Sequence, residues 1–319
     1  MYNKVDFFVY SGTGNTYKIA ETIGEIAAEK GMSFEINMID CNAEPQKYEV
    51  NNDNLLGLMA PTLGFIQPLS FFKFIMRLPK GKGMNVFLVA TGAWTKIGNY
   101  FLPGCIGFGL YLGALILLIK GYKIVGIDGV GMPHNWTTFF PPYTKKLESR
   151  ILNELKSQVT LFADAILEGK KVYKKRGDLI FGILVFPISI LFIFMSHLMF
   201  AKSMFTNHKC NGCGLCNRIC PKKAIEGSLP MVVIYCLLLE LIELNVHVIG
   251  ILQIQNKAAG FSIYYITFIL VIVLGYILFF LFNRIKVFNR IFTYSTFTFY
   301  WRKYKEPSVD IKKLFKILD

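Results

Sequence analysis

The sequence is short of acidic residues, and it lacks the features of several protein classes. It has 21 aspartates and glutamates against 35 lysines and arginines, which gives a net charge of +14. No groove-reading helix and no interleaving of aromatic and basic residues accompanies this excess, so we expect no nucleic acid as a partner. Hydrophobic residues make up 53% of the chain, with a mean hydropathy of +0.43. Basic charge beside apolar runs is typical of the anionic cytoplasmic face of a membrane.

Signs of export and of disulfide bonding are also missing. The N-terminus holds no apolar core of a secretory signal peptide, so we expect the N-terminal part in the cytoplasm. Of the 7 cysteines, only Cys41, Cys105 and Cys236 fall outside one short motif, and they are scattered. This odd set does not suggest disulfides and fits a reducing compartment.

That short motif, at residues 210–221, is the most specific feature of the chain. Four cysteines and a proline follow the spacing C-x2-C-x2-C-x3-C-P: Cys210, Cys213, Cys216, Cys220 and Pro221. Thiolates at this spacing ligate a [4Fe–4S] cluster, and the glycines between the first three cysteines permit the tight turn. Zinc is the alternative, but such zinc sites usually need a second, distant cysteine pair. The motif therefore predicts these four cysteines as ligands of a [4Fe–4S] cluster.

No second motif of this kind follows the first. In two-cluster ferredoxins the last cysteine serves the other cluster, whereas residues 229–254 contain Cys236 as their only cysteine. Loss of the second cluster, a segment turned membranous and a slipped reading frame all remain open. The fourth ligand is then Cys220, Cys236 or a non-protein group, and a [3Fe–4S] cluster is a further alternative.

The N-terminal region predicts a phosphate-binding loop between a strand and a helix. An apolar run at residues 5–10 ends at Ser11-Gly12-Thr13-Gly14-Asn15-Thr16, and a helical pattern follows at once. Hydroxyls and the backbone N–H groups of a helix N-terminus bind phosphate. The loop lacks the Gly-Lys-Ser/Thr ending of a nucleotide P-loop and the G-x-G-x-x-G spacing of a dinucleotide site. We therefore expect it to bind a phosphate monoester without a metal.

This loop resembles the FMN-phosphate loop of flavodoxin. Further apolar runs at residues 33–40, 55–60, 85–91 and 122–130 alternate with helical stretches, which predicts an α/β fold with a doubly wound, parallel, five-stranded sheet. The resemblance implies the strand order 2-1-3-4-5, with FMN at the carboxyl ends of the strands. It also implies that two later loops flank the isoalloxazine ring, with Phe65 or Trp94 stacking on it. Their residues are Thr62, Leu63 and Gly64, and Thr91, Gly92, Ala93 and Trp94.

Apolar segments interrupt and follow this domain. Residues 101–119 stand where a crossover helix is expected but carry no charge, so lipid or another apolar segment of the chain should cover them. Residues 179–201 are long enough to span a bilayer, but a span would separate flavin from cluster. Because basic residues lie at both ends and Pro187 lies inside, we expect an in-plane or re-entrant segment. Residues 261–282 are the best transmembrane candidate, with residues 229–254 as the candidate partner, and the alternative is that both segments lie in the membrane interface.

The chain therefore divides into four parts. These are a flavodoxin-like FMN-binding domain (1–168), a basic hinge with an apolar membrane-associated segment (169–205), a ferredoxin-like [4Fe–4S] motif (206–228), and apolar helical segments with an aromatic–basic tail (229–319). Together they resemble the flavodoxin–ferredoxin fusion proteins of anaerobic bacteria and archaea.

The resemblance implies electron transfer between FMN and a [4Fe–4S] cluster at the cytoplasmic face of the cell membrane. It implies redox donor and acceptor proteins, and the membrane, as partners. One alternative is an enzyme, an FMN- and iron–sulfur-dependent oxidoreductase that reduces a small molecule with His134 or Tyr143 as proton donor. The other alternative is a degenerate membrane protein without a redox role.

Overall fold

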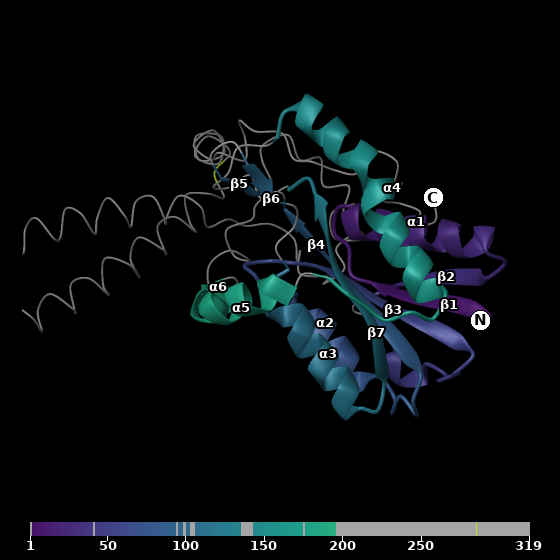
Figure 1. The fold of residues 1–319 in the computed structure, drawn as a ribbon. Coiled ribbons are helices and arrows are strands. Elements are labelled where there is room, and N and C mark those ends of the chain that lie inside the picture. Colours follow the sequence, from purple (N-terminus) through teal and green to yellow (C-terminus); the bar gives the residue numbers. More distant parts are fainter. Residues whose placement is uncertain are drawn as a thin grey trace, which may run out of the picture. The chain divides into compact units, whose positions relative to one another are not determined.

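A computed structural model describes residues 2–40, 42–93, 95–97, 100–102, 106–134, 143–174 and 176–195, together with residue 285. In these residues a six-stranded sheet has the order β2-β1-β3-β4-β7-β8, and its neighbouring strands pair in parallel (Figure 1). The strands are β1 (Lys4–Val9), β2 (Ser33–Met38), β3 (Asn54–Pro61), β4 (Asn85–Ala93), β7 (Lys123–Met132) and β8 (Val172–Tyr173). The short strands β5 (Thr95–Ile97) and β6 (Tyr100–Leu102) form a separate antiparallel pair.

The first five strands of the sheet confirm the flavodoxin-like order. Strands β3, β4 and β7 are buried along almost their whole length, as expected for a parallel sheet covered on both faces. The predicted number of five strands is wrong, because β8 pairs with β7 at Gly126 and Ile127. This sixth strand comes from the stretch expected to be a basic hinge. A strand of two residues carries no periodic pattern that the sequence could reveal.

Two layers of helices cover the sheet. Helices α1 (Asn15–Glu29) and α4 (Lys145–Leu167) lie on one face, and α2 (Leu69–Arg77) and α3 (Gly109–Ile119) lie on the other (Figure 1). A short 3-10 helix, η1 (Pro45–Lys47), precedes β3. Each face therefore has its own apolar core, and together the two cores fix the strands whose ends carry the site.

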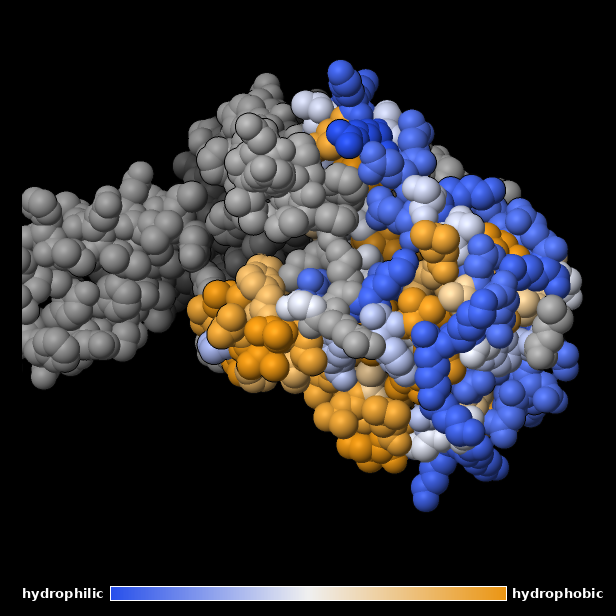
Figure 2. Space-filling model, in the orientation of Figure 1, coloured by the Kyte–Doolittle hydropathy of each residue, from blue (hydrophilic) through white to orange (hydrophobic). Residues whose placement is uncertain are grey.

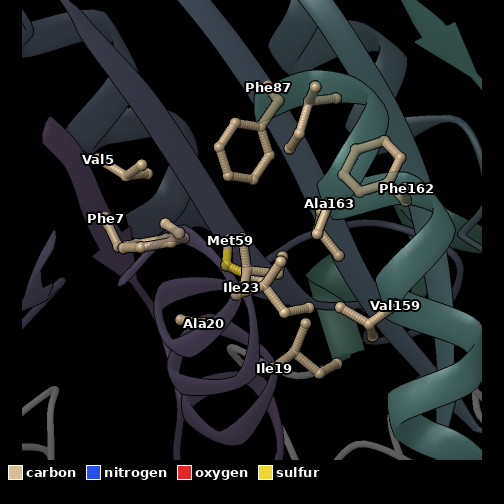
Figure 3. Packing of buried hydrophobic residues seen from close by; sticks show 14 of the residues in the cluster. Val5, Phe7, Ile19, Ala20, Ile23, Met59, Phe87, Val159, Phe162 and Ala163 are labelled. Carbon is tan, nitrogen blue, oxygen red and sulfur yellow. The ribbon is translucent and has the colours of Figure 1, made fainter. Parts of the chain in front are cut away.

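The core under α1 and α4 is built around three aromatic rings. Phe87 makes edge-to-face contacts with Phe7 and with Phe162, each with the ring centroids 6.0 Å apart (Figure 3). Gly57 in β3 makes room for two of these rings, because a Cβ there would lie 2.7 Å from the Phe87 ring and 2.8 Å from that of Phe7. Ile23 of α1 and Val159 of α4 complete this core.

The apolar segments are shorter as helices than as sequence runs. Among the described residues of 101–119, the helical ones are Gly109–Ile119, and Phe101 and Leu102 belong to β6. Residues 179–201 contain the end of helix α5 (Arg176–Leu184) and all of α6 (Phe186–Met195). Pro187 lies in the first turn of α6, where a missing N–H costs nothing. The interruption between α5 and α6 thus lies beside Pro187, where a kink was predicted.

No helix in the described ranges is both long enough and apolar enough to cross a bilayer. Residues 229–254 and 261–282, which held the predicted transmembrane pair, lie outside the described residues. The in-plane or re-entrant character of residues 179–201 stays a prediction.

Tyr122 gives the fold a measurable sensitivity to alkali. It is buried, its hydroxyl donates to the Pro79 carbonyl oxygen over 3.1 Å, and burial raises its pKa to about 12. Because the unfolded chain ionises this phenol near pH 10, its contribution to stability is complete below about pH 10 and is lost as the pH rises to about 12. We expect Tyr122→Phe to remove about 2–3 kcal/mol of the alkaline decrease in unfolding free energy. Denaturant unfolding at pH 9 and pH 12 measures this difference, and an equal decrease in both proteins would contradict it.

Candidate functional site

Four loops meet at the edge where the parallel strands end. The first follows β1, the second follows β3, the third ends β4, and the fourth follows β7. Hydrogen bonds tie them together: the hydroxyls of Thr16 and Thr91 lie 3.0 Å apart, and the Thr62 N–H donates to the Thr91 carbonyl oxygen over 2.8 Å. Asn15 Nδ2 donates to the Pro133 carbonyl oxygen over 2.9 Å. Thr91 is therefore the point that joins the first and second loops to the third.

The first loop has the form expected of a phosphate site. Gly14 adopts φ 92°, a left-handed conformation that turns the chain into α1. Gly12 is exposed, and no atom of the described residues lies within 4 Å of the position that a Cβ would occupy. Ser11 and Thr16 are buried, while Thr13 is half-buried. Open space above Gly12, at the N-terminus of a 15-residue helix whose Tyr17 N–H donates to Ser11 Oγ over 3.4 Å, suits an anion.

The second loop is a tight turn held in a strained conformation. Leu63 and Ile66 exchange backbone hydrogen bonds of 2.8 and 3.4 Å. The two residues between them have positive φ angles, 61° at Gly64 and 64° at Phe65, as in the type I′ turns of β-hairpins. A phenylalanine in this region costs about 1–2 kcal/mol, so surrounding contacts must hold it. The sequence did not predict this turn, because Gly-Phe is not one of the dipeptides typical of type I′ turns.

Helices α5 and α6 supply some of these contacts. The Phe65 ring packs edge-on against Phe181 of α5 with the centroids 5.6 Å apart. Phe192 of α6 lies directly against Gly64, where it occupies the space of a side chain. No contact among the described residues tests whether Phe65 stacks on a flavin ring, so this stays a prediction. Trp94, the other candidate, lies outside the described residues.

Two buried acceptor atoms at this edge lack partners within the described part of the chain. They are Asn15 Oδ1 in the first loop and Gln67 Oε1 in the second. Gln67 is almost wholly buried, and its Nε2 donates to Thr62 Oγ1 over 3.2 Å. An unpaired buried acceptor is costly, so a ligand with O–H or N–H donors would stabilise Asn15 Oδ1, whereas Gln67 Oε1 faces Gly109 at the start of α3. FMN offers such donors in its ribityl chain and its ring, together with a phosphate for the first loop, so these residues fit it. Sequence reasoning missed Gln67, although a lone polar residue between Ile66 and Pro68 was a signal.

The remaining predicted residues fall into two groups. Thr91, Gly92 and Ala93 extend β4 and pair with Val130, Gly131 and Met132 of β7. Cys210, Cys213, Cys216 and Cys220 lie outside the described residues.

A histidine–tyrosine pair follows β7 at the same edge. The rings of His134 and Tyr143 meet edge-to-face with their centroids 4.5 Å apart. Burial raises the pKa of Tyr143 to about 12. A phenol is protonated at neutral pH, and the raised pKa makes this one a hydrogen-bond donor that is a weaker acid than a free tyrosine.

Gly107 packs against the backbone of the second loop, so a side chain at this position should disturb the loop. Its φ is 60°, and a Cβ there would overlap the carbonyl oxygen of Phe65. We expect Gly107→Ala to displace the 63–66 turn and to lower flavin affinity, besides a loss of about 1–2 kcal/mol in stability from the left-handed backbone. Flavin titration and denaturant unfolding measure the two effects. Gly31→Ala is the control, because its φ is 81° but nothing lies within 4 Å of the added Cβ. Equal flavin affinity in the two variants would contradict the role of this contact.

Comparisons with known proteins address the two halves of the chain separately. Residues 205–226 match the family model described as "4Fe-4S binding domain". This match confirms the [4Fe–4S] interpretation of the cysteine motif over the zinc alternative. No protein among curated sequences matches the chain.

Solved structures similar to this chain include several flavodoxins. That of Megasphaera elsdenii is 19% identical, with 48% of this chain and 98% of that chain covered and a TM-score of 0.33. Flavodoxin 1 from Bacillus cereus is 16% identical, with 50% and 97% covered and a TM-score of 0.30. Rubredoxin oxygen:oxidoreductase from Desulfovibrio gigas is 15% identical, with 52% and 36% covered and a TM-score of 0.31.

The observed strand order assigns the fold of the N-terminal half independently of these similarities. The chain thus joins a flavodoxin-like α/β domain to a segment that matches the 4Fe-4S binding domain family, as flavodoxin–ferredoxin fusion proteins do.

Proposed function

We propose that this protein transfers electrons between FMN, bound at the carboxyl edge of the sheet, and a [4Fe–4S] cluster, and that it does so at the cytoplasmic face of the cell membrane. The observation that carries the proposal is the hydrogen-bond network centred on Thr91, which joins the Ser11–Thr16 loop and the loop after β3 to the end of β4. FMN exchanges one or two electrons and the cluster exchanges one, so the pair would link two-electron to one-electron partners.

Residues of these loops would bind different parts of FMN. The N–H groups of the first turn of α1 and the hydroxyls of Ser11 and Thr13 would hold the phosphate. If Thr91 donates its proton to Thr16, the Thr16 hydroxyl proton is left for the phosphate as well. Asn15 Oδ1, which has no partner among the described residues, would accept a hydrogen bond from the ligand. Buried acceptors of this kind fix the orientation of a ligand and discriminate against one that lacks the donors.

The proposal is tested by purifying the full-length chain without oxygen. We expect the visible bands of an oxidised flavin, about one FMN per chain, and about four iron and four sulfide per chain. Stopped-flow spectra should then show electrons passing from reduced flavin to the cluster within one molecule, at a rate independent of protein concentration. A protein with neither chromophore would overturn the proposal.

A second candidate function rests on the contact between His134 and Tyr143 at this edge. A protonated phenol beside an imidazole is an arrangement that can deliver a proton to a substrate reduced by flavin. In that case the protein is a reductase of a small molecule. Turnover of candidate oxidants with an artificial reductant distinguishes the two, because Tyr143→Phe would slow the reductase but not the transfer of electrons to the cluster.

A further inference from the structure

Three helices of the described residues expose a continuous apolar surface. Helix α3 exposes Leu115, Leu118 and Ile119, and helix α5 exposes Ile180, Ile183 and Leu184. Helix α6 adds Ile188, Ile190 and Leu191. Figure 2 shows this apolar surface running from α5 and α6 to α3 on one side of the molecule, while the side of α4 is mostly hydrophilic with smaller apolar patches. We call it the α3–α5–α6 face.

Specific contacts make these helices one surface. The rings of Phe108, at the start of α3, and Phe186, at the start of α6, meet with their centroids 5.3 Å apart. Asp178 of α5 accepts a hydrogen bond of 2.9 Å from the Ile106 N–H. Gly182 of α5 packs against the backbone of Phe108, where any larger residue would clash. Helix α5 is therefore fitted to the beginning of α3, and α6 follows it.

The exposure of this face is too large for a helix surface in water. Ile119 is 78% exposed and Leu184 is 75% exposed. Single exposed leucines are ordinary, but contiguous apolar patches mark an interaction surface. The described ranges of α3 and α6 contain no charged residue, so neither helix has the polar outer side that an aqueous surface requires.

Lysines at the end of this face indicate what covers it. A pocket of about 520 Å³ opens beside the last turns of α3, where Leu115 and Leu118 form one wall. Lys123 and Lys171 also line this pocket, and none of the described residues that line it is acidic. Lys120 caps the C-terminal end of α3. Apolar side chains bordered by lysines match the acyl chains and anionic headgroups of a lipid leaflet.

A protein partner fits this composition less well. Protein–protein interfaces favour tyrosine, tryptophan and arginine and are depleted in lysine. The α3–α5–α6 face exposes mainly leucine and isoleucine, and lysines lie beside its α3 end. We propose that the α3–α5–α6 face docks on a bilayer containing anionic lipid, with the helices lying in the interface rather than crossing it. This deepens the membrane location in the proposed function, on which it rests for the identity of the membrane.

The docking places the flavin loop beside the lipid. Gly64 and Phe65 are the residues that contact Phe192 of α6 and Phe181 of α5. Phe181 belongs to the exposed side of α5 and is 43% exposed. An electron partner that reaches the flavin over this loop would then be one held at the membrane.

A matched pair of leucines tests the docking in the full-length protein. Leu184 on α5 is 75% exposed, and Leu161 on α4, away from the α3–α5–α6 face, is 74% exposed. In vesicles of phosphatidylcholine and phosphatidylglycerol, hydroxyl radicals generated in the water should label Leu161 about tenfold more than Leu184, because interfacial helices bury their apolar side among lipids. A carbene precursor dissolved in the hydrocarbon should show the opposite preference. Equal labelling of the two leucines by the radicals overturns the proposal, whatever other segments anchor the chain.

The other outcomes are equally decisive. Protection of Leu184 from radicals without carbene labelling, or protection that disappears when the protein is diluted in lipid, means that protein covers the face. Equal protection in pure phosphatidylcholine overturns the assignment of anionic lipid. The double variant Ile180→Asp, Leu184→Asp should expose Leu118 to the radicals, whereas Leu161→Asp should not. Flavin absorbance of the same samples tests the electron-transfer proposal separately from the docking proposal. A protein that lacks flavin but has a protected Leu184 would contradict electron transfer and support docking.

Discussion

Serine in place of Cys213 is expected to remove the [4Fe–4S] cluster and to leave FMN bound. Cys213 is the second cysteine of the motif, inside the segment that matches the 4Fe-4S binding domain family. A serine oxygen is a far weaker ligand for iron than a thiolate, and three closely spaced thiolates hold one face of the cluster. Iron should fall from about four atoms per chain to near zero. Flavin content should not change, because every loop of the candidate flavin site lies within residues 11–134. Iron and sulfide assays and the flavin spectrum measure the two cofactors.

The remaining cysteines provide the controls and identify the fourth ligand. Cys41→Ser should keep all the iron, because Cys41 follows β2 in the other half of the chain. Cys220→Ser and Cys236→Ser then compare the two cysteines that are candidates for the fourth ligand. The variant that lacks the true ligand should contain a three-iron cluster or none. Full iron content in Cys213→Ser would refute the cluster assignment. A parallel loss of flavin would show that the two halves do not bind their cofactors independently.

The α/β fold could be predicted from the sequence because its signals are local. Runs such as Val86–Val89 are apolar throughout, and in an α/β chain such runs form central strands. A loop between the first strand and the first helix was predicted for the same reason, although Asn15 and Thr16 already belong to α1. By contrast, β8 has two residues, and its pairing with Gly126 and Ile127 depends on a contact between residues that are distant in sequence and separated by helix α4. Such a contact has no local signature.

The limits of helix α3 are a second feature that the sequence did not predict. Hydropathy treated residues 101–119 as one unit, yet α3 begins only at Gly109. Gly107, with φ 60°, turns the chain just before it, and hydropathy does not record a turn. The link between Thr16 and Thr91 was likewise beyond the sequence, because two hydroxyls 75 positions apart meet only once the sheet has formed. Local patterns therefore predict which loops form the site, and the assembled sheet decides how they are joined.

Valine in place of Thr16 is expected to weaken FMN binding by about 10- to 100-fold while leaving the iron content unchanged, since a hydrogen bond to a charged group contributes about 1.5–3 kcal/mol. Thr16 lies in the first turn of α1, buried, with its Oγ1 3.0 Å from Thr91 Oγ1. Valine has nearly the same shape, so the main loss is the hydroxyl and its link to the third loop. Thr91→Val should have a smaller effect, because the Thr16 hydroxyl can still donate to phosphate. The bulkier pair Thr13→Leu, Thr16→Leu should abolish flavin binding altogether. Flavin fluorescence titration of the apoprotein measures each affinity.

Thr22 supplies the matched control for this experiment. It lies in the same helix and is also buried, but its hydroxyl donates to the Lys18 carbonyl oxygen of α1, one turn earlier. Thr22→Val therefore loses a buried threonine hydroxyl without touching the loops, and its effect on unfolding free energy should be about 1 kcal/mol with FMN affinity unchanged. If Thr16→Val and Thr22→Val bind FMN equally well, the phosphate does not lie on the Ser11–Thr16 loop. The network around Thr91 would then be a structural feature of the sheet edge, and the flavin site would have to be sought elsewhere in the chain.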